Sequence, residues 1–112
     1  MTEQQNFPEM TVRELKDRID QGHAPFLLDV RRPEEYDIAN LNGKLIPLHE
    51  LPNRLDEIAE HRSDEFVVYC RSGARSAQAV AFLRAQGFMG ARNLKGGVLA
   101  WSREIDPSMP TY

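Results

Sequence analysis

A single cysteine stands at the head of a short polar loop. Cys70 follows the apolar run Phe66-Val67-Val68-Tyr69, and the loop after it reads Cys70-Arg71-Ser72-Gly73-Ala74-Arg75. Because Gly73 allows such a loop to curl, successive backbone N–H groups can turn inward and form a nest for an anion. The N-terminus of a following helix adds partial positive charge. This position therefore favours a thiolate over a thiol.

A thiolate held in this way is a nucleophile at neutral pH. If it attacks the outer sulfur of a small anionic donor, Cys70 is left with a persulfide, whose terminal sulfur then passes to a thiol, cyanide or protein acceptor. We expect Arg71 and Arg75 to attract the charged group of the donor. Ser72 and Ser76 can add hydroxyl hydrogen bonds, and Ser76 can also help to start the helix. The predicted substrate-binding residues are Arg71, Ser72, Gly73, Ala74, Arg75 and Ser76.

An alternative is that Cys70 has no chemical role. A lone cysteine that ends an apolar strand is, across proteins, more often a buried small hydrophobe than a nucleophile. The two arginines and the glycine that follow favour the reactive interpretation, since an inert cysteine has no need of an electropositive loop. Asp29 lies near the end of another predicted strand, and for it we favour structural support over catalysis. Arg31 is assigned to the same supporting role.

The apolar pattern predicts strands that alternate with helices. A capping box at Thr11 and Glu14, followed by apolar residues at helical spacing, predicts a helix over 12–21. Short apolar runs predict strands at 26–30 and 66–69. Further elements are expected as a turn at 33–36, an extended stretch at 45–47, helices at 52–60 and 76–86, a strand near 91–93 and a closing helix that contains Leu99, Ala100 and Trp101.

This alternation predicts an α/β fold with a mostly parallel sheet covered by helices on both faces. In such sheets ligands bind beyond the carboxyl ends of the strands. Cys70 and Asp29, each at or near a strand end, should therefore lie at the same edge of the sheet.

Length and composition are those of one ordinary globular domain. The 112 residues are 41% hydrophobic and 28% charged, and no apolar run approaches the length needed to cross a bilayer. We expect a domain over 9–105, a flexible N-terminal segment at 1–8 and a C-terminal tail at 106–112. The first residues lack the basic start and apolar stretch of a secretory signal, which predicts a cytoplasmic location.

Several classes of function are disfavoured. One cysteine and three histidines supply no recognisable zinc site, so neither a metal nor another cofactor is expected. The net charge of -3 gives no general attraction to nucleic acid. We therefore expect neither a nucleic-acid nor a membrane partner.

Several segments are similar, in order and spacing, to motifs of the rhodanese family, and they extend from about Met10 to Trp101. They are Leu28-Asp29-Val30-Arg31 with Pro33-Glu34-Glu35-Tyr36, Asn40-Leu41-Asn42-Gly43, Tyr69-Cys70-Arg71-Ser72-Gly73-Ala74-Arg75-Ser76 and Leu94-Lys95-Gly96-Gly97-Val98-Leu99-Ala100-Trp101. Asn40 stands where the family usually has His. The resemblance implies a rhodanese-like, five-stranded and mostly parallel sheet flanked by helices. It also implies a thiosulfate sulfurtransferase-like enzyme, with Cys70 as the sulfur carrier and the loop amides as its cradle.

Two other functions are compatible with this resemblance. Dual-specificity phosphatases of the cell-division-cycle type and related arsenate reductases share the fold, but their loop between cysteine and arginine is one residue longer. The six residues from Cys70 to Arg75 form a smaller ring, which suits a sulfur atom better than a tetrahedral phosphate. The second alternative is a non-catalytic rhodanese-like binding or sensor module, which usually lacks the cysteine. The physiological sulfur donor and acceptor stay open.

Overall fold

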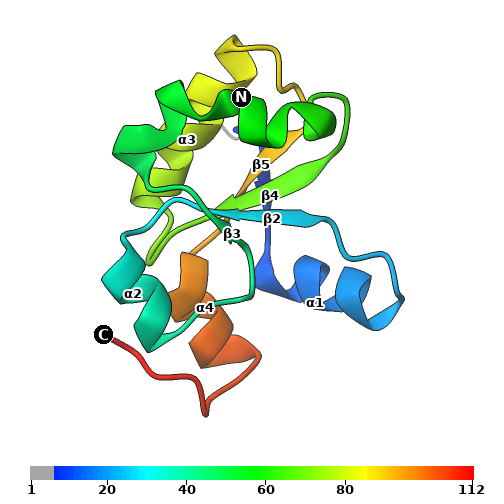
Figure 1. Cartoon of the computed structure of the whole chain (residues 1–112). Helices are drawn as coiled ribbons and strands as arrows, with labels where there is room; N and C mark the ends of the chain where they lie inside the picture. The colour runs from blue at the N-terminus through cyan, green and yellow to red at the C-terminus, as the bar shows by residue number, and fades with distance from the viewer. Residues whose placement is uncertain (1–6) are drawn as a thin grey trace.

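The computed structural model describes residues 7–112. Its centre is a five-stranded sheet in the order β1-β5-β4-β2-β3, and every neighbouring pair is parallel (Figure 1). The strands are β1 Glu9–Met10, β2 Phe26–Asp29, β3 Lys44–Leu45, β4 Phe66–Tyr69 and β5 Ala91–Leu94. The helices are α1 Val12–Asp20, α2 Pro33–Ile38, α3 Ala74–Ala85 and α4 Gly97–Glu104, with 3-10 helices η2 Leu48–Asn53 and η3 Leu55–His61. The predicted α/β fold with a five-stranded parallel sheet is confirmed.

Strand β4 explains why helices cover both faces of the sheet. All four of its residues are buried, and successive side chains of a strand point to opposite faces. Phe66 and Val68 pack in one core with α3, η2 and η3. Val67 and Tyr69 pack in a second core with α1 and α4. In Figure 1, α3 and the 3-10 helices accordingly lie above the sheet and α1 and α4 below it.

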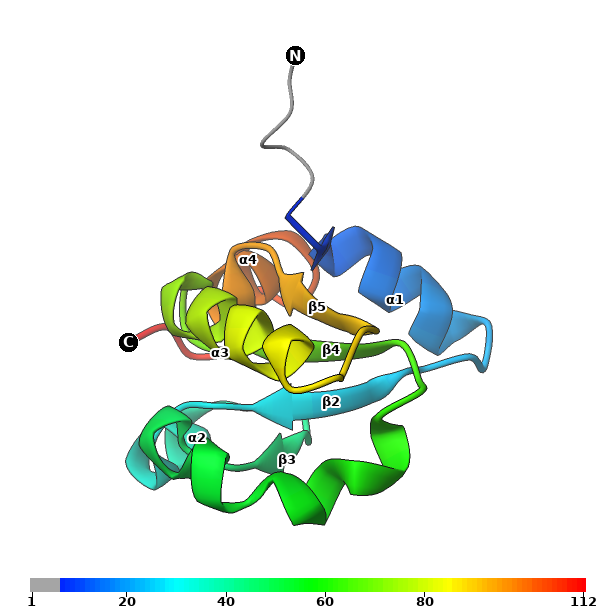
Figure 2. The ribbon, with the colours of Figure 1, turned by 90° about the horizontal axis from the view of Figure 1, so that it is seen from above.

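The strand order places the carboxyl ends of β2 and β4 side by side. Asp29 pairs in register with Tyr69, and the Val30 N–H donates to the Tyr69 carbonyl at 3.1 Å. From β2 the chain goes on to β3 at one side of the sheet, and from β4 to β5 at the other. This is the topological switch point at which open α/β sheets bind ligands. Figure 2 shows α2 and α3 at this edge.

The prediction of one helix over 52–60 is wrong. The chain instead forms the two 3-10 helices η2 and η3. Pro52 lies inside η2, and a proline has no N–H with which to complete an α-helical turn. The bonds from Glu50 N to the Pro47 carbonyl and from Glu57 N to the Arg54 carbonyl have the i to i+3 spacing of such helices.

The other predicted elements are present with shifted ends. Helix α1 begins with the predicted capping box, in which Thr11 and Glu14 exchange hydrogen bonds of 3.0 and 3.1 Å. Compared with the prediction, α1 ends one residue earlier at Asp20 and β2 one residue earlier at Asp29, whereas α2 extends to Ile38 and β5 to Leu94. Helix α3 runs from Ala74 to Ala85 instead of 76–86, and β3 is Lys44–Leu45 instead of 45–47. β1 was not predicted, because two residues are too few to show a period. Within residues 7–112, the helices all fall short of the length and apolarity that a membrane crossing requires.

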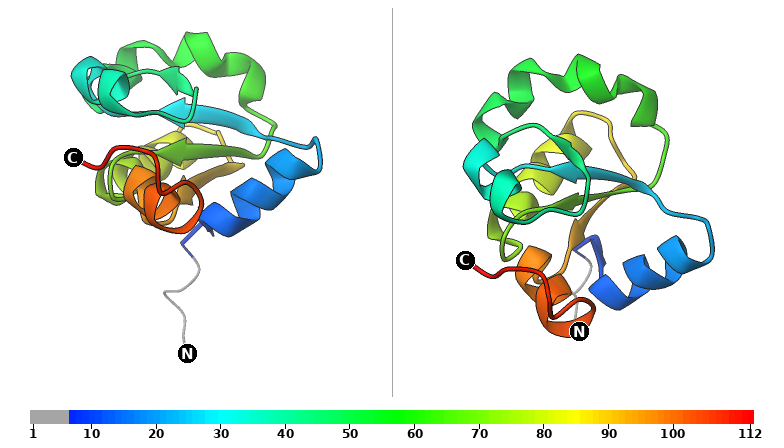
Figure 3. Two further views of the ribbon diagram at one scale, coloured as in Figure 1. Left: turned by 90° about the horizontal axis from the view of Figure 1, so that it is seen from below. Right: turned by 60° about the horizontal axis from the view of Figure 1, so that its bottom comes forward.

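The C-terminal segment, expected as a loose tail, is instead packed against the domain. The Tyr112 hydroxyl accepts a hydrogen bond from Arg31 Nη1 at 2.7 Å and donates to Glu35 Oε2 at 3.0 Å. Figure 3 shows the segment running from α4 towards the edge where α2 lies. The polar composition of the segment does not indicate this packing, because it depends on Tyr112 and on partners far away in the sequence. The flexible segment expected at 1–8 falls, for residues 1–6, outside the described residues.

Candidate active site

Cys70 comes directly after β4, and its sulfur faces the first turn of α3. Gly73 has a φ of 105°, which favours glycine and turns the chain back over the sulfur. Cys70 Sγ accepts hydrogen bonds from Gly73 N at 3.1 Å and from Ser76 N at 3.4 Å. Ser76 Oγ lies 3.3 Å from the sulfur, and its single proton is shared between Cys70 Sγ and Asn93 Oδ1. Two of these donors are amides at the start of α3, where the helix dipole is positive. The loop therefore directs three donors at the Cys70 sulfur.

The burial of Cys70 would suit an inert cysteine equally well. The residue is 1% exposed, and it packs in the same core as Val30 and Val68. An inert thiol, however, is a weak hydrogen-bonding group that packs as a small hydrophobe. Three polar donors converging on the sulfur distinguish this cysteine from an inert one that only fills space in the core.

Asn93 fixes the loop from the neighbouring strand β5. It is 4% exposed, and its Nδ2 donates to the Gly73 carbonyl at 3.2 Å. Its Oδ1 accepts a hydrogen bond from Ser76 Oγ. Asn93 thus holds both residues whose groups contact Cys70 Sγ. The sequence analysis did not single it out, although a polar residue in a predicted strand, three positions before the glycine pair, was the available signal.

The second glycine of that pair lets α4 approach the loop closely. A Cβ atom on Gly97 would lie 2.5 Å from the carbonyl oxygens of Cys70 and Arg71, which is too close for any other residue. Val98 N and Leu99 N donate to the same two carbonyls at 3.0 Å each. The first turn of α4 therefore fixes the backbone of the loop.

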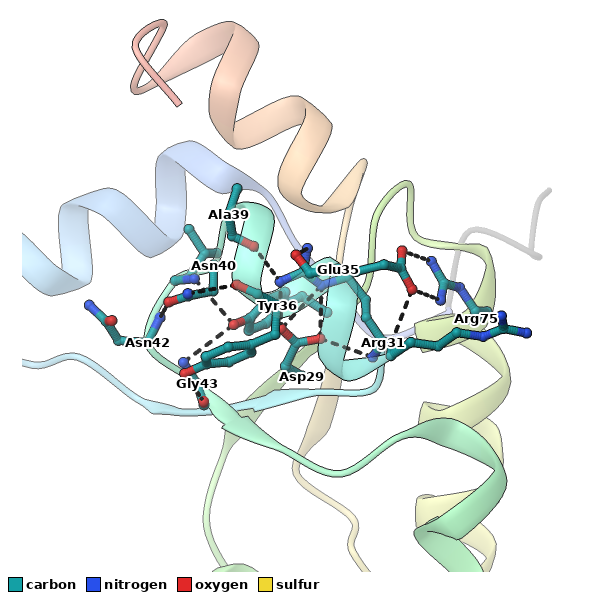
Figure 4. A network of polar contacts seen from close by, with 12 residues as sticks. Asp29, Arg31, Glu35, Tyr36, Ala39, Asn40, Asn42, Gly43 and Arg75 are labelled. Atoms are coloured by element: carbon teal, nitrogen blue, oxygen red, sulfur yellow. Dashed lines mark hydrogen bonds and ion pairs between the residues drawn. The ribbon is translucent and has the colours of Figure 1, made fainter. Parts of the chain in front are cut away.

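Arg75, expected to attract the donor, is bound to α2. Its Nη1 and Nη2 donate to Oε1 and Oε2 of Glu35 at 2.6 and 2.8 Å (Figure 4). The hydrogen bonds from Arg75 lower the pKa of the Glu35 carboxyl to about 2, against the opposing effect of burial. The charge of Arg75 is thereby compensated. The sequence analysis noted Glu35 only as part of a family motif.

The other predicted loop residues face outward. Arg71 donates from Nε to the Tyr112 carbonyl, and its guanidinium lies 5.2 Å from the centroid of the Tyr112 ring. Ser72 and Ala74 are exposed. Of the two loop serines, Ser76 is the one whose hydroxyl contacts the sulfur. The predicted substrate-binding role of these residues stays a prediction.

Asp29 and Arg31 form an ion pair beneath the edge of the sheet. Both side chains are fully buried, and Arg31 Nη2 lies 2.7 Å from Asp29 Oδ2. Arg31 also donates to the Ala39 carbonyl at 2.7 Å, which ties β2 to the end of α2 (Figure 4). Such hydrogen bonds are what a buried ion pair needs. The supporting role predicted for both residues stays a prediction.

Over residues 7–112, no three side chains of His, Cys, Asp or Glu come together as a metal site.

Comparisons with known proteins agree with this geometry. The model of the rhodanese-like domain family matches residues 11–104. A sulfurtransferase of Allochromatium vinosum is 40% identical over 96 residues, which cover 85% of this chain and 88% of that protein. The structure of the human single-domain sulfurtransferase TSTD1 has a TM-score of 0.74 at 31% identity, and the match covers 87% of this chain and 96% of that one.

This chain is similar to one part of a longer relative. The probable adenylyltransferase/sulfurtransferase MoeZ of Mycobacterium tuberculosis is 38% identical over 104 residues, or 92% of this chain. The match spans 26% of that protein, about a quarter of its length. The family match over 11–104, the two relatives of similar length and the loop geometry lead to one assignment: the chain belongs to the rhodanese-like domain family.

Proposed function

We propose that this protein is a sulfurtransferase that carries sulfur as a persulfide on Cys70. The observation that supports this most directly is the convergence of Gly73 N, Ser76 N and Ser76 Oγ on Cys70 Sγ. These donors stabilise the thiolate before reaction and again after transfer, without any rearrangement of the backbone. The relatives of similar length named as sulfurtransferases also support the proposal.

Thiosulfate is the donor that we propose for the first half-reaction. The Cys70 thiolate attacks the outer sulfur of thiosulfate, a sulfur–sulfur bond forms on Cys70, and the bond inside thiosulfate breaks. Its electron pair leaves with sulfite. Arg71 and the backbone of residues 71–76 are proposed to hold the anion, with Arg75 shaping the loop through Glu35.

An acceptor nucleophile completes the cycle. A thiolate, cyanide or a protein thiol attacks the outer sulfur of the persulfide, and the electron pair of the broken bond returns to Cys70 Sγ. The acceptor leaves as a persulfide or as thiocyanate. No metal or other cofactor takes part in this scheme. We keep the predicted cytoplasmic location as part of the proposal.

Phosphatase or arsenate chemistry is disfavoured by the position of Arg75. A phosphate bound in the loop would need a guanidinium to neutralise its oxygens. Arg75 instead makes two hydrogen bonds to Glu35. The six-residue span from Cys70 to Arg75 also disfavours phosphatase chemistry, because its ring is smaller than that of the phosphatase loop.

Sulfur transfer can be measured as thiocyanate formed from thiosulfate and cyanide. Cys70→Ser should lower the rate by about a thousandfold or more, because serine cannot carry the sulfur. Ser72→Ala changes an exposed residue of the same loop and should keep nearly full activity. Wild-type turnover in Cys70→Ser would contradict the proposal. No turnover in the wild type with thiosulfate, polysulfide or a persulfide would favour the binding-module alternative.

A further inference from the structure

A cleft of about 310 Å³ opens beside the active loop. It is lined by Val30, Arg32, Pro47, Leu48, His49 and Arg75. These residues follow the carboxyl ends of β2 and β3, begin η2, or lie on the first turn of α3. Val30 N bonds to the Tyr69 carbonyl, and Val30 packs in the same core as Cys70, so the Val30 side of the cleft lies beside the buried cysteine, which is not itself part of the lining. The cleft therefore lies at the switch point of the sheet, where a ligand is expected.

The cation available in this cleft is Arg32. Arg75 also lines it, but its charge is compensated by the two hydrogen bonds to Glu35. Among residues 7–112, no carboxylate lies within ion-pair distance of the Arg32 guanidinium, and the side chain is exposed. His49 stands on the same wall, 78% exposed and 3.5 Å from Glu50. Glu50 in turn accepts a hydrogen bond from Arg54 at 2.8 Å.

The rest of the lining is apolar. Val30 and Pro47 are buried and Leu48 is half-buried, and such walls favour methylene groups over water. The volume is at the lower end of the range for small-molecule sites, and it exceeds what a small inorganic ion such as thiosulfate needs. The lining therefore fits an aliphatic stem that ends in an anionic group.

We propose that the cleft binds the acceptor, a low-molecular-weight thiol with a carboxylate on an aliphatic stem, and that Arg32 recognises the carboxylate. This proposal rests on the persulfide function of Cys70. The thiolate of the acceptor attacks the outer sulfur of the persulfide and forms a new sulfur–sulfur bond. The bond to Cys70 Sγ breaks, and its electron pair restores the Cys70 thiolate.

Two acceptors of equal length separate recognition of the carboxylate from sulfur chemistry. 3-Mercaptopropionate and 3-mercapto-1-propanol differ in the terminal group alone. Arg32→Ala should raise the KM for the carboxylate thiol about tenfold, the size expected for one charge-assisted contact. The KM for the alcohol should change less than about twofold. Arg32→Lys keeps the charge and should recover part of the loss.

Arg13→Ala is the matched control, because Arg13 is an exposed arginine of α1 that pairs with Glu104. It should leave the KM of both thiols unchanged. Equal rises for both thiols in Arg32→Ala would overturn the proposal. An equal effect of Arg13→Ala on the carboxylate thiol would overturn it too, since general surface charge would then explain the result.

Binding without sulfur transfer keeps this test separate from that of the proposed function. In Cys70→Ser protein, 3-(methylthio)propionate should shift the NMR signals of residues 30–32 and 47–49, whereas 3-(methylthio)propan-1-ol should shift them much less. The difference should disappear in Cys70→Ser/Arg32→Ala. Equal shifts with both thioethers, or signals that move elsewhere, would overturn the assignment of the cleft even if persulfide transfer is established.

Discussion

Arg75 and Glu35 join the active loop to α2 through two parallel hydrogen bonds of 2.6 and 2.8 Å. The side chains are 35% and 15% exposed, so water screens the pair only in part. Since Arg75 lies on the first turn of α3, the pair fixes the end of the loop that carries Ser76. The geometry of the donors around Cys70 therefore depends on Glu35, which precedes Arg75 by 40 positions in the sequence.

Replacement of Glu35 should loosen this end of the loop. Glu35→Gln keeps one acceptor oxygen and loses the charge, so we expect a several-fold fall in kcat/KM for sulfur transfer, with thiosulfate and with neutral donors alike. Glu57→Gln is a matched control, because Glu57 also makes two hydrogen bonds to one arginine, Arg54, at 2.7 and 3.0 Å. Unchanged activity in Glu35→Gln, or an equal loss in Glu57→Gln, would contradict the role of the pair.

The same pair should contribute to stability in a pH-dependent way. The folded-state pKa of Glu35, about 2, is below the ordinary value of 4.5. The contribution is therefore complete at neutral pH, declines as the pH falls below about 4.5 and is lost near pH 2. Chemical unfolding between pH 7 and pH 2.5 should show a smaller acid-induced loss in Glu35→Gln, by about 1 kcal/mol. Parallel curves for the two proteins would rule this out.

Much of the fold could be predicted because its elements carry local signals. The capping box at Thr11 and the buried run of β4 mark α1 and the central strand without reference to any distant residue. In place of the helix predicted at 52–60 the chain forms two 3-10 helices, with Pro52 inside the first of them. β1 and the docking of Tyr112 depend on partners far away in sequence, which no local pattern reveals.

The site was predicted unevenly for the same reason. Cys70, Gly73 and Ser76 are close in sequence, so their meeting follows from a loop that turns into a helix. Asn93 and Glu35 reach the loop from β5 and α2, and only the tertiary structure brings them there. Arg75 was expected to bind the sulfur donor, because the sequence does not show that its guanidinium is already hydrogen-bonded to Glu35.

Replacement of Ser76 should slow persulfide formation more than replacement of Ser72, the other serine of the loop. Its hydroxyl lies 3.3 Å from Cys70 Sγ, so Ser76→Ala should lower kcat/KM for persulfide formation about tenfold. The change also leaves Asn93 Oδ1 without its donor and should destabilise the fold by about 1 kcal/mol. Ser72→Ala, the same substitution at an exposed position, should do neither. Equal kinetics for the two variants would show that the Ser76 hydroxyl has no role in transfer.

Gly73 should be sensitive to the smallest possible side chain. Gly73→Ala places a Cβ atom at a φ of 105°, which costs about 1–2 kcal/mol, and the Cβ would lie 3.4 Å from Gly96 N. Gly22→Ala imposes similar strain at a φ of 78° with no neighbour within 4 Å. Thermal unfolding should show a loss of stability in both variants. Sulfur transfer should fall in Gly73→Ala and persist in Gly22→Ala, and equal activity in the two would argue against the amide cradle.

The central claim is a covalent sulfur on Cys70, and the intact mass of the protein tests it most directly. After incubation with thiosulfate, the wild type should gain the mass of one sulfur atom, and cyanide should remove it. Cys70→Ser, treated in the same way, should gain nothing. A gain of the same mass in Cys70→Ser, or a wild type that forms thiocyanate without ever carrying the added sulfur, would contradict the persulfide mechanism.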